Sequence, residues 1–105
     1  MLTQNAAIET VRNYARDIEA RGVHLRKVIL YGSFAKGTQH EWSDIDVALV
    51  ADEFTGFAFD DCKLYSGLGI KKPYIRIEEK TYPTDYFLKG DPFIDEIKKE
   101  GIVIR

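Results

Sequence analysis

Two strand-forming segments, separated by a sharp turn, constrain the fold of this chain more than any other feature of its sequence. Residues 28–31 read VILY, a short continuous apolar run that predicts a buried strand. Gly32 and Ser33 end this run abruptly, and residues 34–43 show no clear period, which indicates a short helical turn followed by a loop. Residues 44–50 predict the second strand, because β-branched side chains are frequent among them.

Helices are predicted before and after these strands. Residues 5–21 carry apolar side chains at helical spacing with charged residues between them, and Gly22 follows. Near the other end of the chain, Asp91 suits the N-cap and Pro92 the first position of a helix that Gly101 ends. The side chains expected to face inward from this last helix are those of Phe93, Ile94 and Ile97.

The rest of the chain gives weaker signals. Residues 74–81 alternate well enough to predict a third strand, and Pro83 marks a turn after it. Residues 102–104 predict a short closing strand. Glycines interrupt residues 51–73, so this stretch gives no clear pattern, although its composition allows a helix over residues 60–66.

The size and composition of the chain favour one cytoplasmic domain. A length of 105 residues suits a single domain over residues 1–105, and 45% apolar residues suffice for a core. No apolar run approaches the about 20 residues needed to span a membrane, and residues 1–4 lack the pattern of a signal peptide. Cys62 is the only cysteine, so the chain has no internal disulfide. We therefore expect a cytoplasmic protein without a membrane partner.

The charge balance argues against a surface for long nucleic acids. The chain has 15 basic and 17 acidic residues, a net charge of −2, and its basic residues are scattered. Proteins that bind DNA or RNA usually present a basic face that neutralises several phosphates. Nucleic acid is therefore not expected as a partner, whereas a small nucleotide chelated through a metal ion is compatible with this charge.

Two carboxylates open the second predicted strand. Side chains of a strand alternate between faces, so Asp44 and Asp46 are expected on the same face, about 7 Å apart along the backbone. Like charges so close repel each other unless a cation or a proton lies between them. Mg²⁺ prefers hard oxygen ligands and commonly takes one or two carboxylates together with substrate phosphates. The pair therefore predicts a metal site suited to phosphoryl transfer.

Gly32 and Ser33 predict a phosphate-binding turn about a dozen residues before this pair. Gly32 allows the backbone to approach a ligand closely, and Ser33 places a hydroxyl at the start of a short helix, where free N–H groups favour an anion. Either feature alone has a simpler explanation: Gly-Ser is usually just a turn, and Asp-x-Asp is usually the polar face of a strand. The ordered combination is much more specific.

Residues 32–37, GSFAKG, followed by residues 43–47, SDIDV, resemble the signature of the polymerase-beta-like nucleotidyltransferase superfamily, and the short chain resembles its minimal nucleotidyltransferases. The resemblance implies an α/β (α+β) fold, a small mixed β-sheet with helices packed on one face. It also implies a two-metal Mg²⁺ site on Asp44 and Asp46, with ATP or another nucleoside triphosphate held at Gly32 and Ser33. Candidate further contacts in the motif are Lys36, which is also explained as a solvated loop lysine, and Gly37.

The superfamily normally supplies a third carboxylate from a neighbouring strand. Residues 74–81 offer Glu78 and Glu79; with Ile75 and Ile77 facing the core, Glu78 is expected on the open face, as a metal ligand or general base. Glu79 would project from the core-facing side of the strand, as Ile77 does, unless the alternation breaks down at the strand end. Two further carboxylates, Asp60 and Asp61, are outside candidates. The superfamily more commonly has Asp at the third position, so a Glu there puts full activity in question.

The resemblance implies a nucleotidyltransferase that moves a nucleoside monophosphate, with AMP from ATP as the expected case, to a hydroxyl acceptor. Larger members carry extra domains that select the acceptor. Resemblance to the minimal members implies instead a separate partner, a small helical protein of the HEPN type, with the nucleotidyltransferase acting as the antitoxin of a toxin–antitoxin pair. The alternative is a catalytically degenerate binding module that neutralises its partner by docking alone.

Overall fold

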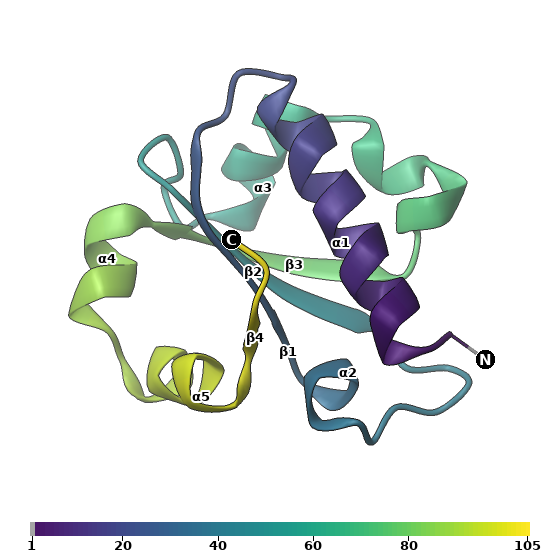
Figure 1. The fold of residues 1–105 in the computed structure, drawn as a ribbon. Helices are drawn as coiled ribbons and strands as arrows, with labels where there is room; N and C mark the ends of the chain where they lie inside the picture. Colours follow the sequence, from purple (N-terminus) through teal and green to yellow (C-terminus); the bar gives the residue numbers. More distant parts are fainter. Residues whose placement is uncertain (1) are drawn as a thin grey trace.

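The computed structural model describes residues 2–105 and contains a four-stranded mixed sheet in the order β3-β2-β1-β4 (Figure 1). The strands are β1 (Leu25–Tyr31), β2 (Ile45–Ala51), β3 (Ile77–Pro83) and β4 (Ile102–Val103). Strand β1 is antiparallel to β2 and β4, whereas β2 and β3 are parallel. The expected mixed sheet is therefore confirmed.

Helices precede, connect and follow these strands. The α-helices are α1 (Gln4–Glu19), α2 (Ser33–Lys36), α3 (Ala58–Asp61), α4 (Thr84–Lys89) and α5 (Pro92–Glu100). Three short 3₁₀ turns, η1 (Cys62–Tyr65), η2 (Leu68–Ile70) and η3 (Lys72–Tyr74), complete the crossover between the parallel strands β2 and β3. In this part of the chain, residues 2–105, no helix is both long and apolar enough to cross a membrane.

Helix α5 begins and ends where the sequence predicts, because its capping signals are local, whereas α1 begins one residue earlier and ends two residues earlier than the predicted range 5–21. The Asp91 carboxylate accepts a hydrogen bond from the Ile94 N–H at 2.7 Å, Pro92 occupies the first turn of α5, and Gly101 follows its last residue. At α1, the Thr3 hydroxyl accepts from the Ala6 N–H at 3.1 Å.

Both faces of the sheet carry helices. Helix α1 covers one face and shares a core with β1 and β2, whose members on that face include Leu30, Val47 and Leu49. On the other face, Phe87 of α4 and the α5 isoleucines pack on Ile29, Ala48 and Val50. Figure 1 shows α1 on one side of the sheet and α4 and α5 on the other. The expectation of helices on one face is therefore corrected: the second face is partly covered, and its uncovered part carries the candidate site.

Several details of the sequence prediction differ from the structure; for example, β1 starts at Leu25 rather than at residue 28. Strand β3 starts at Ile77, because the preceding residues fold into η3, and Ile75 is 69% exposed and faces no core. Helix α4 was not predicted, since its six residues are too few to show a period. Residues 60–66 split between α3 and η1. In α5, Phe93 is half exposed, because it lies near the helix start, beyond the sheet residues that bury Ile94 and Ile97.

Candidate functional site

A row of three side chains crosses the uncovered part of the second face. Strand register pairs Tyr31 with Asp46 and Asp46 with Glu78. Because directly paired residues project from the same face of a sheet, the two carboxylates lie side by side on neighbouring strands. Strand β2 is otherwise buried, so Asp46 is its only partly exposed residue.

The electrostatics of Asp46 indicate a site in which negative charge prevails. Burial raises the pKa of the Asp46 carboxyl above its usual value, the neighbouring Glu78 and Asp44 carboxylates raise it further, and the Lys80 ammonium partly opposes them. A carboxylate repelled by two neighbouring carboxylates suits a divalent cation, because a cation between them relieves this repulsion. The donor set, hard oxygen only, suits Mg²⁺ rather than a softer metal.

The carboxylates approach each other without forming a closed cluster. Across residues 2–105, no group of three or more His, Cys, Asp or Glu side chains is arranged as a ready-made metal site. Any coordination shell built on Asp44, Asp46 and Glu78 therefore needs oxygens from water or from a ligand, which is common for Mg²⁺ in proteins.

Asp44 lies outside the strand, in a loop that Arg76 fixes. Asp44 precedes the first residue of β2 and is exposed. The Arg76 guanidinium donates hydrogen bonds to the carbonyl oxygens of Ser43 and, at 3.1 Å, of Glu41. The Ser43 hydroxyl in turn accepts from the His40 N–H at 2.9 Å. The orientation of Asp44 therefore depends on a residue from the start of the neighbouring strand, a dependence that the sequence does not reveal.

Gly32 is in contact with Asp46. It adopts φ 73° and ψ −152°, a conformation that is essentially restricted to glycine. A Cβ atom at this position would lie 2.3 Å from Asp46 Oδ2, so no larger residue fits without displacing the carboxylate. Gly37 has a positive φ as well, 75°, at the C-cap of α2, but its missing Cβ would meet no atom within 4 Å.

The other two candidate nucleotide contacts lie on α2. Ser33 is the first residue of this short helix and is half-buried. Lys36, at its end, forms an ion pair with Glu100 of α5, with 3.1 Å between Nζ and Oε2. Lys36 is therefore occupied by a partner within the chain rather than free beside the carboxylates.

Two hollows lie on either side of Tyr31. The first, called the β3 hollow, has a volume of about 510 Å³ and is lined by Asp46 and by residues of β3 that include Glu78, Lys80 and Tyr82. The second, called the α5 hollow, has about 380 Å³ and is lined by Gly32, Lys36 and residues of α5. The site is thus an open cleft of a size that admits a small molecule.

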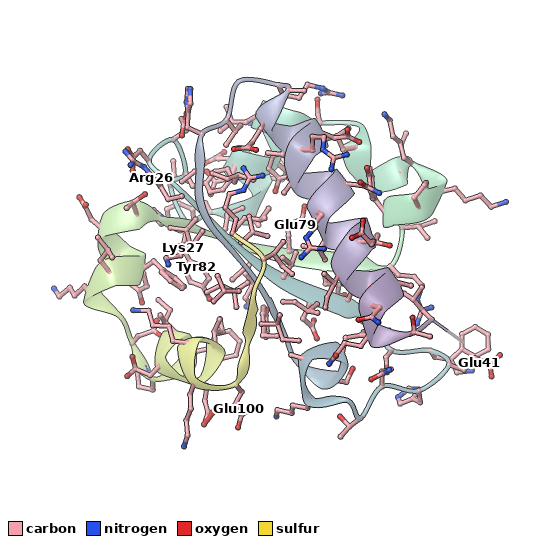
Figure 2. All side chains as sticks on the ribbon, in the orientation of Figure 1. Arg26, Lys27, Glu41, Glu79, Tyr82 and Glu100 are labelled. Atoms are coloured by element: carbon pink, nitrogen blue, oxygen red, sulfur yellow. The ribbon has the colours of Figure 1, made fainter. Side chains whose placement is uncertain are left out.

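Glu79 lies on the opposite face of the sheet from Glu78. Its carboxylate accepts a hydrogen bond from the Tyr14 hydroxyl of α1 at 2.6 Å. Burial, followed by this hydrogen bond, raises the pKa of Tyr14. Figure 2 shows Glu79 on the side of the sheet that faces α1 and Tyr82 on the side that faces α4. Glu79 is therefore engaged in packing, while Glu78 projects into the β3 hollow.

The two aspartates of α3 are not part of this arrangement. Asp61 is 1% exposed and accepts hydrogen bonds from the Thr81 hydroxyl at 2.6 Å, from Thr55 and from the Gly56 N–H. Burial opposes its ionisation, but these hydrogen bonds prevail and lower its pKa. Asp61 thus ties the loop before α3 to β3, whereas Asp60 lies near Lys63 at the surface.

Comparison with known proteins adds one finding to this geometry. A family model described as "Nucleotidyltransferase domain" matches residues 8–104, a span that includes every residue of the candidate site. Comparison with curated proteins gives no significant match.

Proposed function

Because this chain belongs to the nucleotidyltransferase domain family, we propose that it transfers a nucleoside monophosphate from a nucleoside triphosphate to a hydroxyl acceptor and releases pyrophosphate. ATP is the expected donor, and AMP the group transferred. The observation that carries the proposal is the register that brings Asp46 beside Glu78, with Asp44 near enough to raise the Asp46 pKa.

Asp44, Asp46 and Glu78 would hold magnesium in this scheme. The fit rests on the oxygen-only donor set and on the repulsion of Asp46 by the Glu78 and Asp44 carboxylates. Bound magnesium would neutralise negative charge on the phosphates during transfer. The protein itself would position these ligands. The buried strand β2 fixes Asp46, and the hydrogen bonds of Arg76 to the loop before β2 fix Asp44.

The order of residues across the sheet supports an in-line reaction. Gly32 and Ser33 follow the end of β1, on one side of Asp46, and Glu78 lies on β3, on the other side. Phosphoryl transfer requires the attacking and leaving oxygens to lie on opposite sides of the phosphorus. The β- and γ-phosphates therefore bind beside Gly32 and Ser33, and the acceptor enters from the β3 side.

Glu78 acts on the acceptor. The acceptor oxygen bonds to the α-phosphorus, its proton passes to the Glu78 carboxylate, and the bond from that phosphorus to the bridging oxygen breaks. The electron pair of the broken bond leaves with pyrophosphate. Glu reaches one methylene further than the Asp that the superfamily commonly has at this position, and its place opposite Asp46 in the ladder keeps it within the β3 hollow.

The proposed acceptor is a hydroxyl on a protein partner. The resemblance of residues 32–47 to minimal nucleotidyltransferases supports a small helical HEPN-type partner, with this chain as the antitoxin. Exposed aromatic side chains near the β3 hollow, Phe57 and Tyr86, are of the kind that is enriched in protein interfaces. The identity of the partner rests on the resemblance and not on these contacts.

Two observations favour the alternative of a docking module without activity. The described residues hold no ready-made cluster of three metal ligands, and the third carboxylate is Glu rather than Asp. A single experiment separates the two: the chain is incubated with a HEPN-type protein, Mg²⁺ and ATP labelled on its α-phosphate. Transfer of label that requires Mg²⁺ and is lost in Asp46→Asn supports the enzyme. Inhibition of the partner by wild type and by Asp46→Asn alike, with no label transferred, would establish docking alone.

A further inference from the structure

We propose that Lys80, rather than Lys36, is the residue that binds the phosphates of the nucleotide. This inference rests on the proposed function and assigns a substrate contact within the same site. The motif on α2 directs attention to Lys36, and the structure assigns the role to a lysine on β3, outside the motif.

Lys80 lies on the same face of the sheet as the carboxylates. The register pairs Asp46 with Glu78 and, two residues further along both strands, Ala48 with Lys80. Side chains two residues apart on a strand share a face, so Lys80 projects beside Glu78. Among the described residues that line the β3 hollow, Lys80 is the only cation.

The side chain of Lys80 crosses the site toward the place proposed for the phosphates. Its Nζ lies 5.3 Å from the centre of the Phe93 ring, at the start of α5. The Phe93 ring packs edge-on against Tyr31, with 5.7 Å between ring centres, and Tyr31 is the residue before Gly32. The ammonium therefore lies beside the Phe93 ring, which contacts the residue before Gly32, and its effect on the Asp46 pKa agrees with a position near that carboxylate.

The Lys80 ammonium is free to bind an anion, whereas neighbouring cations are occupied. Within residues 2–105, Lys80 forms no ion pair. Lys36 is paired with Glu100, Arg76 donates to backbone carbonyls, and Lys98 donates to the Phe87 carbonyl at 3.0 Å. The interaction of an ammonium with an aromatic ring is weak compared with its hydrogen bond to a phosphate. Lys80 therefore loses little binding free energy when it leaves the Phe93 ring to bind a phosphate.

The charge of the site requires such a residue. A nucleoside triphosphate is a polyanion, and it must approach Asp46, which the Glu78 and Asp44 carboxylates already repel. Metal ions offset part of this charge, and a lysine that approaches from β3 adds a positive group that forms hydrogen bonds with phosphate oxygens.

The test compares matched variants of the two lysines by measuring the affinity for Mg²⁺-ATP in calorimetry. Lys80→Met should weaken Mg²⁺-ATP binding by about tenfold or more, Lys80→Arg should largely restore it, and Lys36→Met should change it by less than about threefold. Both methionine variants keep the aliphatic bulk of lysine and remove one charge. Affinity unchanged in Lys80→Met, or lowered at least as much in Lys36→Met, would overturn the assignment.

A second measurement distinguishes a phosphate contact from a structural role. Affinity for Mn²⁺ alone, followed by electron paramagnetic resonance, should stay equal or rise in Lys80→Met, because a positive charge beside the carboxylates is removed. Loss of Mn²⁺ binding in parallel with Mg²⁺-ATP binding would show that the substitution disturbs the carboxylates and would overturn the assignment. Wild-type protein that fails to bind Mg²⁺-ATP at all would overturn the proposed function itself, whereas normal wild-type binding with an unaffected Lys80→Met refutes only the role of Lys80.

Discussion

Gly32 and Asp46 are fitted to each other: a Cβ atom on residue 32 would lie 2.3 Å from the Asp46 Oδ2 atom. The glycine is thus required by a side chain of the protein, independently of any ligand. Gly32 also has a backbone conformation, φ 73° and ψ −152°, that other residues avoid. The contact joins the two halves of the sequence motif, the turn after β1 and the carboxylate on β2.

Gly32→Ala should lower both stability and ligand binding. We expect a loss of about 1–3 kcal/mol in the free energy of unfolding, measured by urea denaturation, from backbone strain and displacement of the carboxylate. Binding of Mg²⁺-ATP should fall with it. Gly37→Ala is the matched control, because Gly37 also has positive φ but an added Cβ there meets no atom within 4 Å. Equal loss of binding in both variants would mean that the contact with Asp46 is unimportant.

Asp46→Asn should separate stability from binding. The substitution removes one of two like charges that face each other across β2 and β3, so the free energy of unfolding at pH 8 should stay equal or rise by about 0.2–1 kcal/mol. Mg²⁺-dependent binding of ATP should be lost, and Asp44→Asn should have the same effect on binding. Circular dichroism and calorimetry measure the two properties, and wild-type Mg²⁺-ATP affinity in both variants would show that the site lies elsewhere.

Metal affinity should rise with pH over a range above that of an ordinary aspartate. Burial and the Glu78 and Asp44 carboxylates raise the pKa of Asp46 in the folded state. Protonation of Asp46 therefore stabilises the fold at low pH, and this contribution to the free energy of unfolding is lost as the pH rises through the folded-state pKa. Metal requires the ionised carboxylate and therefore displaces a proton. Titration of Mn²⁺ between pH 4.5 and 7.5 should show this increase, with proton release on binding, and a pH-independent affinity would contradict it.

Glu78→Gln and Glu79→Gln should have opposite consequences. Glu78→Gln should reduce turnover more than it weakens Mg²⁺-ATP binding, because the proposed general base is lost. Glu79→Gln should cost about 1 kcal/mol or more of stability through the weakened hydrogen bond from Tyr14, with turnover per folded molecule preserved. A larger effect of Glu79→Gln on turnover would place the third carboxylate on the other face of β3.

Arg76→Ala should weaken metal-dependent binding although Arg76 contacts no ligand in the proposed site. Its guanidinium holds the carbonyls of Ser43 and Glu41, so its loss frees the loop that carries Asp44. We expect a decrease of about tenfold in Mg²⁺-ATP affinity. Arg26→Ala is the control, because Arg26 forms an exposed ion pair with Asp52, far along β1 from Tyr31. Similar effects of both substitutions would point to overall charge rather than to the loop.

The sequence predicts those features that depend on neighbouring residues. The caps of α5 at Asp91 and Gly101 are local, and so is the alternation along β3 that separates Glu78 from Glu79. Features that depend on strand register cannot be predicted from the sequence alone. The hydrogen bonds of Arg76 to the Ser43 loop and the burial of Asp61 against Thr81 arise only when β3 pairs with β2.

Contacts between distant segments also decide features that the local sequence does not show. The predicted strand starts at Tyr74, but Tyr74 ends η3, where its hydroxyl donates a hydrogen bond to the Asp17 carboxylate of α1 at 2.6 Å. Lys36 lies in the motif and attracts a functional interpretation, but the approach of α5 pairs it with Glu100. In each case a contact between distant segments decides the outcome.

Asp44 and Asp46 belong to segments of different rigidity. Asp46 belongs to a strand that is buried along its remaining length, so its amide should exchange with solvent only when the whole domain opens. Asp44 belongs to a surface loop that Arg76 ties to the start of β3, and opening such a surface segment costs only a small fraction of the free energy of global unfolding. A local fluctuation of this loop would therefore disrupt the proposed metal site while the domain stays folded. A partner that binds this loop and moves Asp44 would inactivate the proposed site without altering the hydrophobic core.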